Sequence, residues 1–360
     1  MSGLDQIRAK IDELDEKIQT LINERAACAQ QIARIKQSSG EVASYYRPER
    51  EAKILHAVQA RNQGPLGKEE MARLFREIMS ACLALEKRLC IAYLGPEGTF
   101  TELAALKHFG NSIETRPMSA IDEVFREVES GAAPYGVVPV ENSTEGVVSH
   151  TLDMFIQSPL KICGEVLLRI HLNLLSKSKS LKSVREVVAH QQALAQCREW
   201  LDENLPGVPR TAVSSNAEAA RIAGGSKKAG VAAVSSQRSA ELYKLNVLAA
   251  NIEDEPDNTT RFLVIGKQSV PASGQDKTSL MVAAKNKPGA LYQLLAPLAN
   301  HELSMTRIES RPSRRGTWEY VFFIDVEGHC EDVPVQRALR ALEKEAAVLK
   351  LLGSYPRAVL

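Results

Sequence analysis

The sequence lacks the patterns by which a metal ion or a nucleotide is most often bound. Its six cysteines (28, 82, 90, 163, 197 and 330) form no C-x-x-C pair, which argues against a zinc site and against a disulfide framework. It contains neither a G-x-G-x-x-G run nor a P-loop, so nucleotide binding is not expected. We therefore expect no cofactor and no metal, and a location in the reducing cytoplasm.

The sequence also lacks a charge excess and long apolar runs. The net charge is +1, so no nucleic acid is expected as a partner. No apolar run approaches the roughly 20 residues that span a bilayer, and the charged, amphipathic first residues are unlike a secretory leader. With 360 residues, 44% of them hydrophobic and 25% charged, the composition indicates a soluble globular protein of two or three domains.

Residues 1–90 are expected to form an all-helical domain. Apolar residues recur at helical spacing from residue 4 to residue 36, without Pro or Gly, and Ser38-Ser39-Gly40 ends the pattern. Two further helices are expected, from Pro48 to Arg61 and from Lys68 to about Leu89. A first helix of about 33 residues is too long to bury its apolar stripe on two short partners. We therefore expect a dimer.

Three basic residues, Arg8, Arg25 and Lys36, lie within the first predicted helix. Arg25 and Lys36 share a helix face, roughly 16 Å apart along the axis. Arg8 is roughly 42 Å from Lys36, so it can join the other two only from a second, antiparallel copy of the helix. The alternative is an ordinary solvated charged face.

These basic residues, with Arg50-Glu51 on the second helix and Glu86 on the third, resemble the all-helical chorismate mutases. The resemblance implies that chorismate rearranges to prephenate in an intertwined dimer, with Arg8 supplied by the other chain. Arginines suit a dicarboxylate through their fork geometry. The implied mutase residues are Arg8, Arg25, Lys36, Glu51 and Glu86 as catalytic residues, and Arg47, Arg50 and Cys82 as substrate-binding residues.

Within this resemblance, Lys36 would face the ether oxygen of chorismate and Glu51 would hold the substrate hydroxyl. Cys82, one turn before Glu86, would line the pocket. The sequence departs from the best-known pattern at two positions. Glu86 stands where many members have Gln, and Arg47 stands where some have Asp, which leaves the role of Arg47 open.

Residues 91–267 alternate between predicted strands and helices, which indicates an α/β fold in two lobes with mostly parallel sheets. The strands expected include 91–94, 135–140, 166–175 and 231–234. Five strand–turn–helix units place Ser, Thr, Asn, Gln or His at the start of a helix. Ligands of such sheets lie at the carboxyl ends of the strands, and this crevice suits a small carboxylate.

The stretch Gly136–Val148, GVVPVENSTEGVV, is the centre of this segment. Its apolar run is expected to be a buried strand that delivers Glu141–Gly146 to the N-terminus of a helix running from about Val147 towards Ile156. A helix N-terminus offers free backbone N–H groups to an anion. The alternative is a loop that only caps its helix.

Three motifs, GPEGTF (95–100), VENSTEG (140–146) and TTRF (259–262), together resemble prephenate dehydratases. The resemblance implies loss of CO2 and of the ring hydroxyl from prephenate, giving phenylpyruvate, with Thr260 as the catalytic residue. One position departs from the family, because Ala189 stands where a substrate-contacting serine is common. The implied substrate-binding residues are Glu141, Asn142, Ser143, Thr144, Gln196, Arg261 and Phe262.

The chemistry of this reaction limits what Thr260 can do. The departing ring hydroxyl needs a hydrogen-bond donor or a proton source, and a threonine hydroxyl is too weak an acid to give up its proton alone. We interpret Thr260 as a donor that stabilises the leaving oxygen, with Glu141 or a water molecule as the proton source. The alternative is that Thr259-Thr260 only caps a turn.

Residues 268–277 are expected to be a linker, and 278–356 show a βαββαβ pattern, which predicts a ferredoxin-like α+β domain. Gly289-Ala290-Leu291 and Glu309-Ser310-Arg311-Pro312 resemble the phenylalanine-sensing ACT domains of prephenate dehydratases. The resemblance implies that these seven residues bind L-phenylalanine as an effector. The alternative for the second motif is an ordinary strand end before a proline.

The whole chain thus resembles a bifunctional chorismate mutase–prephenate dehydratase of phenylalanine biosynthesis. The expected domains are an all-helical mutase domain (1–90), a two-lobed α/β dehydratase domain (91–267) and an ACT domain (278–356). The expected partners are chorismate, prephenate, L-phenylalanine and a second copy of the chain, in a homodimer or a larger assembly. Two alternatives are a non-catalytic small-carboxylate receptor with a helical dimerisation arm, and a dehydratase whose mutase arm has decayed.

Overall fold

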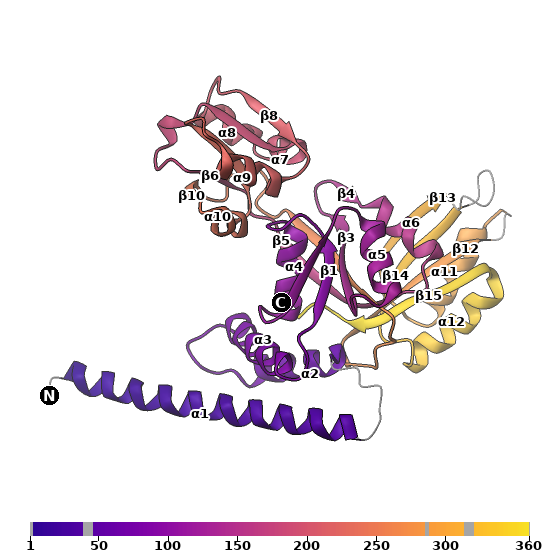
Figure 1. Cartoon of the computed structure of the whole chain (residues 1–360). Coiled ribbons are helices and arrows are strands. Elements are labelled where there is room, and N and C mark those ends of the chain that lie inside the picture. Colours follow the sequence, from indigo (N-terminus) through magenta and orange to yellow (C-terminus); the bar gives the residue numbers. More distant parts are fainter. Residues whose placement is uncertain (1–2, 39–45, 285–287, 313–319, 360) are drawn as a thin grey trace. The chain divides into compact units, whose positions relative to one another are not determined.

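The computed structural model describes residues 3–38, 46–284, 288–312 and 320–359 (Figure 1). These residues form two compact units, one of 1–89 with 109–114 and one of 90–108 with 115–360. Three predicted features lie outside the described residues: the helix stop at Ser39-Gly40, the end of the loop up to Gly316, and the strand start at Trp318. No helix of the described ranges is long and apolar enough to cross a membrane.

The first unit contains the three predicted helices: α1 (Gly3–Ser38), α2 (Pro48–Arg61) and α3 (Lys68–Ala84). Helix α1 is continuous from end to end (Figure 1). The expected extension of α3 to Leu89 is wrong. The N–H groups of Leu85 and Glu86 bond to carbonyls three residues back, a tighter pattern than the α-helix, and the helix ends at Ala84.

The apolar stripe of α1 remains exposed in the single chain. Leu14, for example, is 48% exposed and Ile35 is 66% exposed. The exposed apolar residues of this helix are Leu4, Ile7, Ile11, Leu14, Ile18, Leu21, Ile22, Ile32 and Ile35. An exposed apolar patch of this kind marks a protein interaction surface.

The first sheet of the second unit has the strand order β2-β1-β3-β11-β5, with β4 paired to β3. Strand β3 is parallel to β1 but antiparallel to β11, which is also antiparallel to β5. The strands are β1 (Cys90–Leu94), β2 (Glu114–Met118), β3 (Tyr135–Asn142), β4 (Gly146–Val147), β5 (Lys161–Arg169) and β11 (Thr259–Gly266). The helices of this lobe are α4 (Phe100–Phe109), α5 (Ile121–Ser130) and α6 (Ser149–Gln157).

The second lobe is built on a sheet of order β10-β6-β9-β7-β8. Strand β7 is parallel to β8 and β9, whereas β6 is antiparallel to β9 and β10. The strands are β6 (Asn173–Ser176), β7 (Glu186–His190), β8 (Arg210–Val213), β9 (Val231–Ser235) and β10 (Asn246–Ala249). The helices are α7 (Gln191–Gln196), α8 (Arg198–Asn204), α9 (Asn216–Gly225) and α10 (Gln237–Tyr243), with a short 3-10 turn at Leu181–Ser183.

The prediction of mostly parallel sheets is wrong, because both sheets are mixed. The chain leaves the first sheet after β5 and returns to it as β11, so the outgoing and returning strands lie side by side in opposite directions. For the same reason the single strand predicted over 166–175 is two strands in two sheets. The strands expected at 91–94, 135–140 and 231–234 are confirmed.

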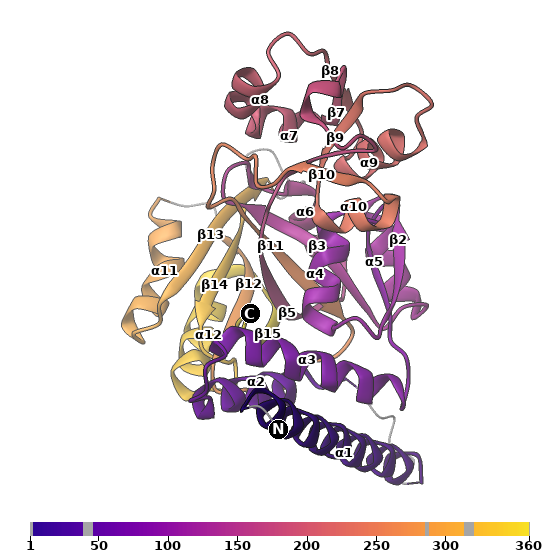
Figure 2. The ribbon, with the colours of Figure 1, turned by 90° about the vertical axis from the view of Figure 1, so that its left-hand side faces the viewer.

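The C-terminal part has the predicted βαββαβ order and the ferredoxin-like strand order β13-β14-β12-β15, with antiparallel neighbours. Helices α11 and α12 pack on one face of this sheet (Figure 2). The elements are β12 (Asp276–Ala284), α11 (Ala290–Asn300), β13 (Met305–Pro312), β14 (Tyr320–Glu327), α12 (Val333–Glu345) and β15 (Ala346–Pro356).

The other face of the C-terminal sheet shares a hydrophobic core with the first lobe. Phe323 and Leu352 of this sheet pack in one cluster with Leu152 and Phe155 of α6. The backbones also approach closely, because a Cβ atom added to Gly353 would lie 2.3 Å from the carbonyl oxygen of Ile162. The C-terminal domain is therefore packed on the first lobe as part of one folded body.

Candidate active sites

The loop Glu141–Gly146 forms a β-hairpin rather than a helix N-terminus. Glu141 pairs with Val147 and Asn142 with Gly146 across β3 and β4, and Gly146 takes the positive φ of +83° that this tight turn requires. Helix α6 begins only at Ser149, after β4. The predicted direct connection of this loop to the start of the helix is therefore wrong, as is the alternative that the loop only caps the helix.

Asn142 is the centre of a set of hydrogen bonds at this hairpin. Its Oδ1 accepts the backbone N–H groups of Thr144 (3.0 Å) and Glu145 (2.9 Å), so its Nδ2 must be the donor on the other side. Nδ2 donates to Thr260 Oγ1 (2.8 Å) and to Asn258 Oδ1 (2.7 Å). Because the Thr260 oxygen accepts this bond, its own O–H points to a different acceptor.

The second lobe reaches the same hairpin through Gln196 at the end of α7. Gln196 Nε2 donates to the carboxylate of Glu145 at 3.1 Å. Ser143 is fixed against the strand that carries Thr260, since its Oγ accepts the Thr259 N–H at 2.9 Å and its N–H donates to the Thr259 carbonyl. Five predicted residues thus lie in one connected set: Asn142, Ser143, Thr144, Gln196 and Thr260.

Sequence reasoning did not single out two members of this set, Glu145 and Asn258. Asn258 is buried and accepts from Asn142, and Glu145 accepts from Gln196. Glu145 lies within the VENSTEG motif, and Asn258 directly precedes the TTRF motif. Their polar side chains at these positions were the only pattern that pointed to them.

Three other predicted residues, Glu141, Arg261 and Phe262, do not join this set. Because strand side chains alternate between faces, Glu141 and Arg261 point away from Asn142 and Thr260. Arg307 of β13 binds Glu141 at 3.0 Å. Phe262 is buried in the interior of the first lobe, 2% exposed.

Arg261 lies in a buried charged cluster. It donates to Glu165 (2.8 Å), Asp325 (2.6 Å) and the hydroxyl of Tyr355 (3.0 Å). Burial alone would lower the pKa of Arg261, but Tyr355, Asp325 and Glu165 outweigh it and raise that pKa. The guanidinium is therefore firmly charged and fully engaged.

The GPEGTF motif connects the two lobes through Gly98. Its carbonyl accepts from the hydroxyls of Ser236 and Ser239 at the start of α10, both at 3.0 Å. Gly98 has a φ of +87°, and a Cβ atom there would lie 2.8 Å from Ser239 Oγ. Only glycine fits this close approach without strain.

Polar residues at helix starts, as predicted, cap several helices. His190, Ser215 and Ser236 each accept a backbone N–H of the helix that follows. Ala189, at the position where a serine is common, is fully buried.

In the helical unit, Lys36 lies close to Glu86. Burial raises the pKa of Glu86 above its ordinary value, and the charge of Lys36 opposes this shift. Glu86 lies in the turn after α3, not on the helix as predicted, because α3 ends at Ala84. Cys82, in the last turn of α3, is buried.

Glu51 forms a largely buried ion pair with Arg76, at 3.5 Å. Burial raises the pKa of Glu51, and Arg76 opposes the shift. Sequence reasoning missed Arg76. A charged residue between the apolar positions Ala72 and Met79 of α3 was the pattern that pointed to it, since a charge on a buried face needs a partner.

Within a single chain, Arg8 does not reach the other predicted residues of the mutase site. Arg8 is exposed near the start of α1, roughly 42 Å along the axis from Lys36. Arg25 is half-buried and Arg50 is exposed. Arg47 pairs with Glu49 at 2.7 Å.

Three family models match the chain in succession: chorismate mutase type II over residues 7–87, prephenate dehydratase over 91–270 and the ACT domain over 278–344. A bifunctional chorismate mutase/prephenate dehydratase of Pseudomonas aeruginosa is 55% identical over the full length of both chains. The chain belongs to the family of bifunctional chorismate mutase/prephenate dehydratases. It is therefore an enzyme with a mutase domain and a dehydratase domain.

Two solved structures resemble the dehydratase and ACT parts. A prephenate dehydratase of Arthrobacter aurescens in complex with L-Phe has a TM-score of 0.70 and 35% identity, over 75% of this chain and 90% of that chain. GqqA, described as a novel type of quorum quenching acylase, has a TM-score of 0.69 and 31% identity, over 75% of this chain and 98% of that chain. Because one fold serves two named activities, the site residues must decide the function.

The residues predicted to bind the effector lie on two elements of the ACT domain. Gly289, with a φ of +75°, Ala290 and Leu291 lie at the start of α11. Glu309, Ser310, Arg311 and Pro312 lie on β13, an edge strand of the sheet. Ser310 and Pro312 are exposed, whereas Glu309 and Arg311 are half-buried.

Proposed function

We propose that the chain rearranges chorismate to prephenate in its helical domain, converts prephenate to phenylpyruvate in its dehydratase domain, and is inhibited by L-phenylalanine bound to its ACT domain. The pathway served is phenylalanine biosynthesis. The observation that carries the dehydratase assignment is the bond from Asn142 to Thr260 within a set that both lobes supply.

In the dehydratase site, Thr260 donates a hydrogen bond from its hydroxyl to the oxygen that leaves the ring, without giving up its proton. Asn142 supports this role, because an oxygen that already accepts an amide N–H has its own proton available for another acceptor. Arg261 forms an ion pair on the face of β11 that points away from Thr260. Arg307 binds Glu141, which likewise points away from Asn142 and Thr260. The ring carboxylate is therefore not held by these cations and departs as neutral CO2.

A proton source for the leaving hydroxide must lie on the same side as Thr260. Glu141, which the sequence suggests for this role, is bound to Arg307. We propose Glu145 instead, because its backbone N–H binds Asn142 and its carboxylate faces Gln196 of the second lobe.

In the mutase site, Lys36 and Glu86 face the ether oxygen of chorismate, and Glu51 holds the substrate hydroxyl. The rearrangement needs no covalent intermediate, so positioning and electrostatic stabilisation suffice. Arg25, Arg47, Arg50 and Cys82 line this pocket in our assignment. The nearness of Lys36 to Glu86 supports it.

The mutase site needs a second copy of the chain. Arg8 is too far along α1 to reach Lys36 of its own chain, and the apolar stripe of α1 is exposed. An antiparallel α1 from another copy covers this stripe and delivers Arg8 to the site. We therefore propose a homodimer as the smallest active form.

L-phenylalanine is the effector in this proposal, bound by Gly289–Leu291 and Glu309–Pro312. The L-Phe complex of the Arthrobacter aurescens relative supports this choice. Inhibition further requires that the effector bind two states of the enzyme with different affinity.

The test follows chorismate, prephenate and phenylpyruvate over time with the purified full-length chain, with and without L-phenylalanine. The proposal expects chorismate to be consumed, phenylpyruvate to form, and L-phenylalanine to slow the second step. A chain that binds chorismate or prephenate and converts neither would instead be the small-carboxylate receptor. A chain that converts only prephenate would be a dehydratase with a decayed mutase arm.

A further inference from the structure

The edge strand β13 presents alternate residues to the dehydratase domain. Arg307 and Arg311, four residues apart, point to the same face of the strand, and both bind residues of the first lobe. Glu309, a predicted effector residue, lies between them on that face. The strand that carries half of the predicted effector site is thus attached directly to the dehydratase.

Arg307 holds the end of strand β3. Its Nε lies 3.0 Å from Glu141 Oε2, and its side chain is only 10% exposed. Glu141 precedes Asn142, whose amide orients the Thr260 hydroxyl. One residue of backbone therefore separates the Arg307 ion pair from the set that contains the catalytic threonine.

Arg311 holds the helix that follows the active-site hairpin. Its guanidinium donates to both carboxylate oxygens of Asp153, at 3.1 and 3.2 Å, and to Ser149 Oγ at 2.9 Å. A guanidinium that bridges two side chains of the first turns fixes both the position and the direction of α6.

The other end of α6 is also held by the ACT domain. Lys350 of β15 donates to the carbonyl oxygens of Phe155 (2.8 Å) and Ser158 (2.6 Å). Burial lowers the pKa of Lys350. A cation at the C-terminal carbonyls of a helix is favourable, so α6 is held at both ends by side chains of the ACT domain.

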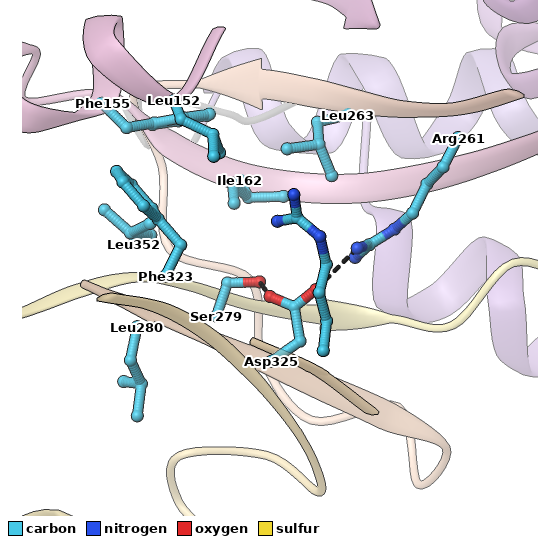
Figure 3. A pocket seen from close by; sticks show the side chains of 11 residues that line it. Leu152, Phe155, Ile162, Arg261, Leu263, Ser279, Leu280, Phe323, Asp325 and Leu352 are labelled. Atoms are coloured by element: carbon cyan, nitrogen blue, oxygen red, sulfur yellow. Dashed lines mark hydrogen bonds and ion pairs between the residues drawn. The ribbon is translucent and has the colours of Figure 1, made fainter. Parts of the chain in front are cut away.

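Arg307 also lines a small cavity between the ACT sheet and the first lobe. The cavity has an apolar wall that includes Leu152 and Phe323 (Figure 3). Arg261, next to the catalytic Thr260, lies at this cavity and binds Asp325, which also accepts from Ser279. Charges in such low-dielectric surroundings interact more strongly than on the surface.

We propose that Arg307 and Arg311 are positioning residues of the dehydratase, and that they transmit effector binding on β13 to the active site. Arg307 acts through Glu141 on the Asn142–Thr260 bond, and Arg311 acts through Asp153 on α6 and the hairpin before it. This inference rests on the proposed function. A ligand that contacts Glu309 and Ser310 shifts β13, and both arginines carry the shift to the hairpin. Displacements of about 1 Å in a catalytic set reduce rates up to a hundredfold.

The first experiment compares Arg307→Gln and Arg307→Lys with the wild-type full-length chain. We expect Arg307→Gln to lower the dehydratase kcat about tenfold with little change in KM, and Arg307→Lys to restore part of the loss. Mutase activity, measured on the same sample, reports the folded helical domain. The matched control is Arg357→Gln, which breaks the half-exposed Arg357–Glu327 pair of the ACT domain and leaves both activities unchanged.

The second experiment separates transmission from effector binding by changing Asp153, which is not a predicted effector residue. For Asp153→Asn we expect calorimetric binding of L-phenylalanine to stay near the wild-type value. The inhibition of the dehydratase by L-phenylalanine should weaken roughly 2- to 30-fold.

Several outcomes would overturn the inference. Wild-type kcat and wild-type inhibition in both Arg307→Gln and Asp153→Asn would show that the ion pairs transmit nothing. Parallel loss of L-phenylalanine binding and inhibition in Asp153→Asn would mean that this residue supports the effector site instead. Failure of the proposed function looks different, since the wild-type chain itself would then form no phenylpyruvate.

Discussion

The amide nitrogen of Asn142 lies 2.8 Å from the hydroxyl oxygen of Thr260, across the paired strands β3 and β11. The two residues are 118 positions apart in the sequence. The hairpin fixes the direction of the bond, because Oδ1 of Asn142 is occupied by two backbone N–H groups. The Thr260 oxygen accepts this bond, so its own proton is available for another acceptor, which in our proposal is the leaving oxygen of the substrate.

The substitution Asn142→Asp tests this orientation with almost no change of shape. An aspartate keeps the two bonds from the hairpin backbone but donates none to Thr260. We expect the dehydratase kcat to fall about 10- to 100-fold, while mutase activity persists. The control is Asn204→Asp, which removes a donor on the exposed surface of the second lobe. Equal dehydratase rates in Asn142→Asp and the wild type would show that this bond has no catalytic role.

We expect the protonation of Glu86 to make the mutase activity, but not the dehydratase activity, depend on pH. A carboxyl donates a hydrogen bond to the ether oxygen only when protonated. Burial raises the pKa of Glu86 and Lys36 lowers it, with a net upward shift. Mutase activity should therefore be full below this pKa and fall as pH rises through it.

The variant Glu86→Gln donates at every pH, so its mutase profile should stay flat where the wild type declines. The dehydratase profile of the same sample serves as the control and should not change. Superimposable mutase profiles for wild type and Glu86→Gln would mean that Glu86 is only a carboxylate at the edge of the core.

Mixing two inactive chains tests whether the mutase site is shared. We expect Arg8→Ala and Lys36→Ala each to lose mutase activity. In a mixed dimer, one of the two sites combines Arg8 and Lys36 from different chains. Random exchange should therefore restore about a quarter of the wild-type mutase rate. Sedimentation of the same samples should show dimers, and no recovery in exchanged dimers would place Arg8 outside the site.

The buried carboxyl of Asp325 should make the stability of the second unit decrease at low pH. Burial opposes its ionisation, but Arg261 and Ser279 outweigh burial, so the pKa of Asp325 lies below its ordinary value. A carboxyl with a lowered folded-state pKa stabilises the fold above its unfolded-state pKa. This contribution is lost as pH falls through the folded-state value.

The change Asp325→Asn should lower the free energy of unfolding by about 3 kcal/mol at neutral pH, because it leaves Arg261 without one buried partner. The difference from wild type should shrink as the pH is lowered, in thermal denaturation of the full-length chain. The control is Asp257→Asn, which breaks the pair between Arg169 and a 95% exposed carboxylate and should unfold like the wild type. A pH-independent difference would assign the effect of Asp325→Asn to packing alone.

The sequence predicts the fold best where one element obeys one periodicity. Helix α1 and the ferredoxin-like order follow directly from spacing and length. The mixed sheets could not be predicted, because the direction of β11 depends on the chain crossing to the second lobe and back. A local sequence pattern can predict where a strand lies, but its neighbours and direction in the sheet depend on the topology of the whole chain.

The candidate site shows the same limit. The motifs predicted Thr260 and Asn142 as site residues. They did not predict that a hairpin holds Asn142 or that Glu141 points away towards Arg307. The face of a strand on which a residue lies follows from its register, and register depends on pairing between distant segments. The Arg307–Glu141 ion pair depends on how the ACT sheet packs on the first lobe, which no local pattern specifies.

The most direct test of the whole account is the product of chorismate turnover by Thr260→Ala. This change removes one hydroxyl at the leaving oxygen, and loss of one such donor costs roughly 10²- to 10³-fold in rate. Chorismate should disappear at nearly the wild-type rate, and prephenate should accumulate in place of phenylpyruvate. Formation of phenylpyruvate at close to the wild-type rate by this variant would contradict the account.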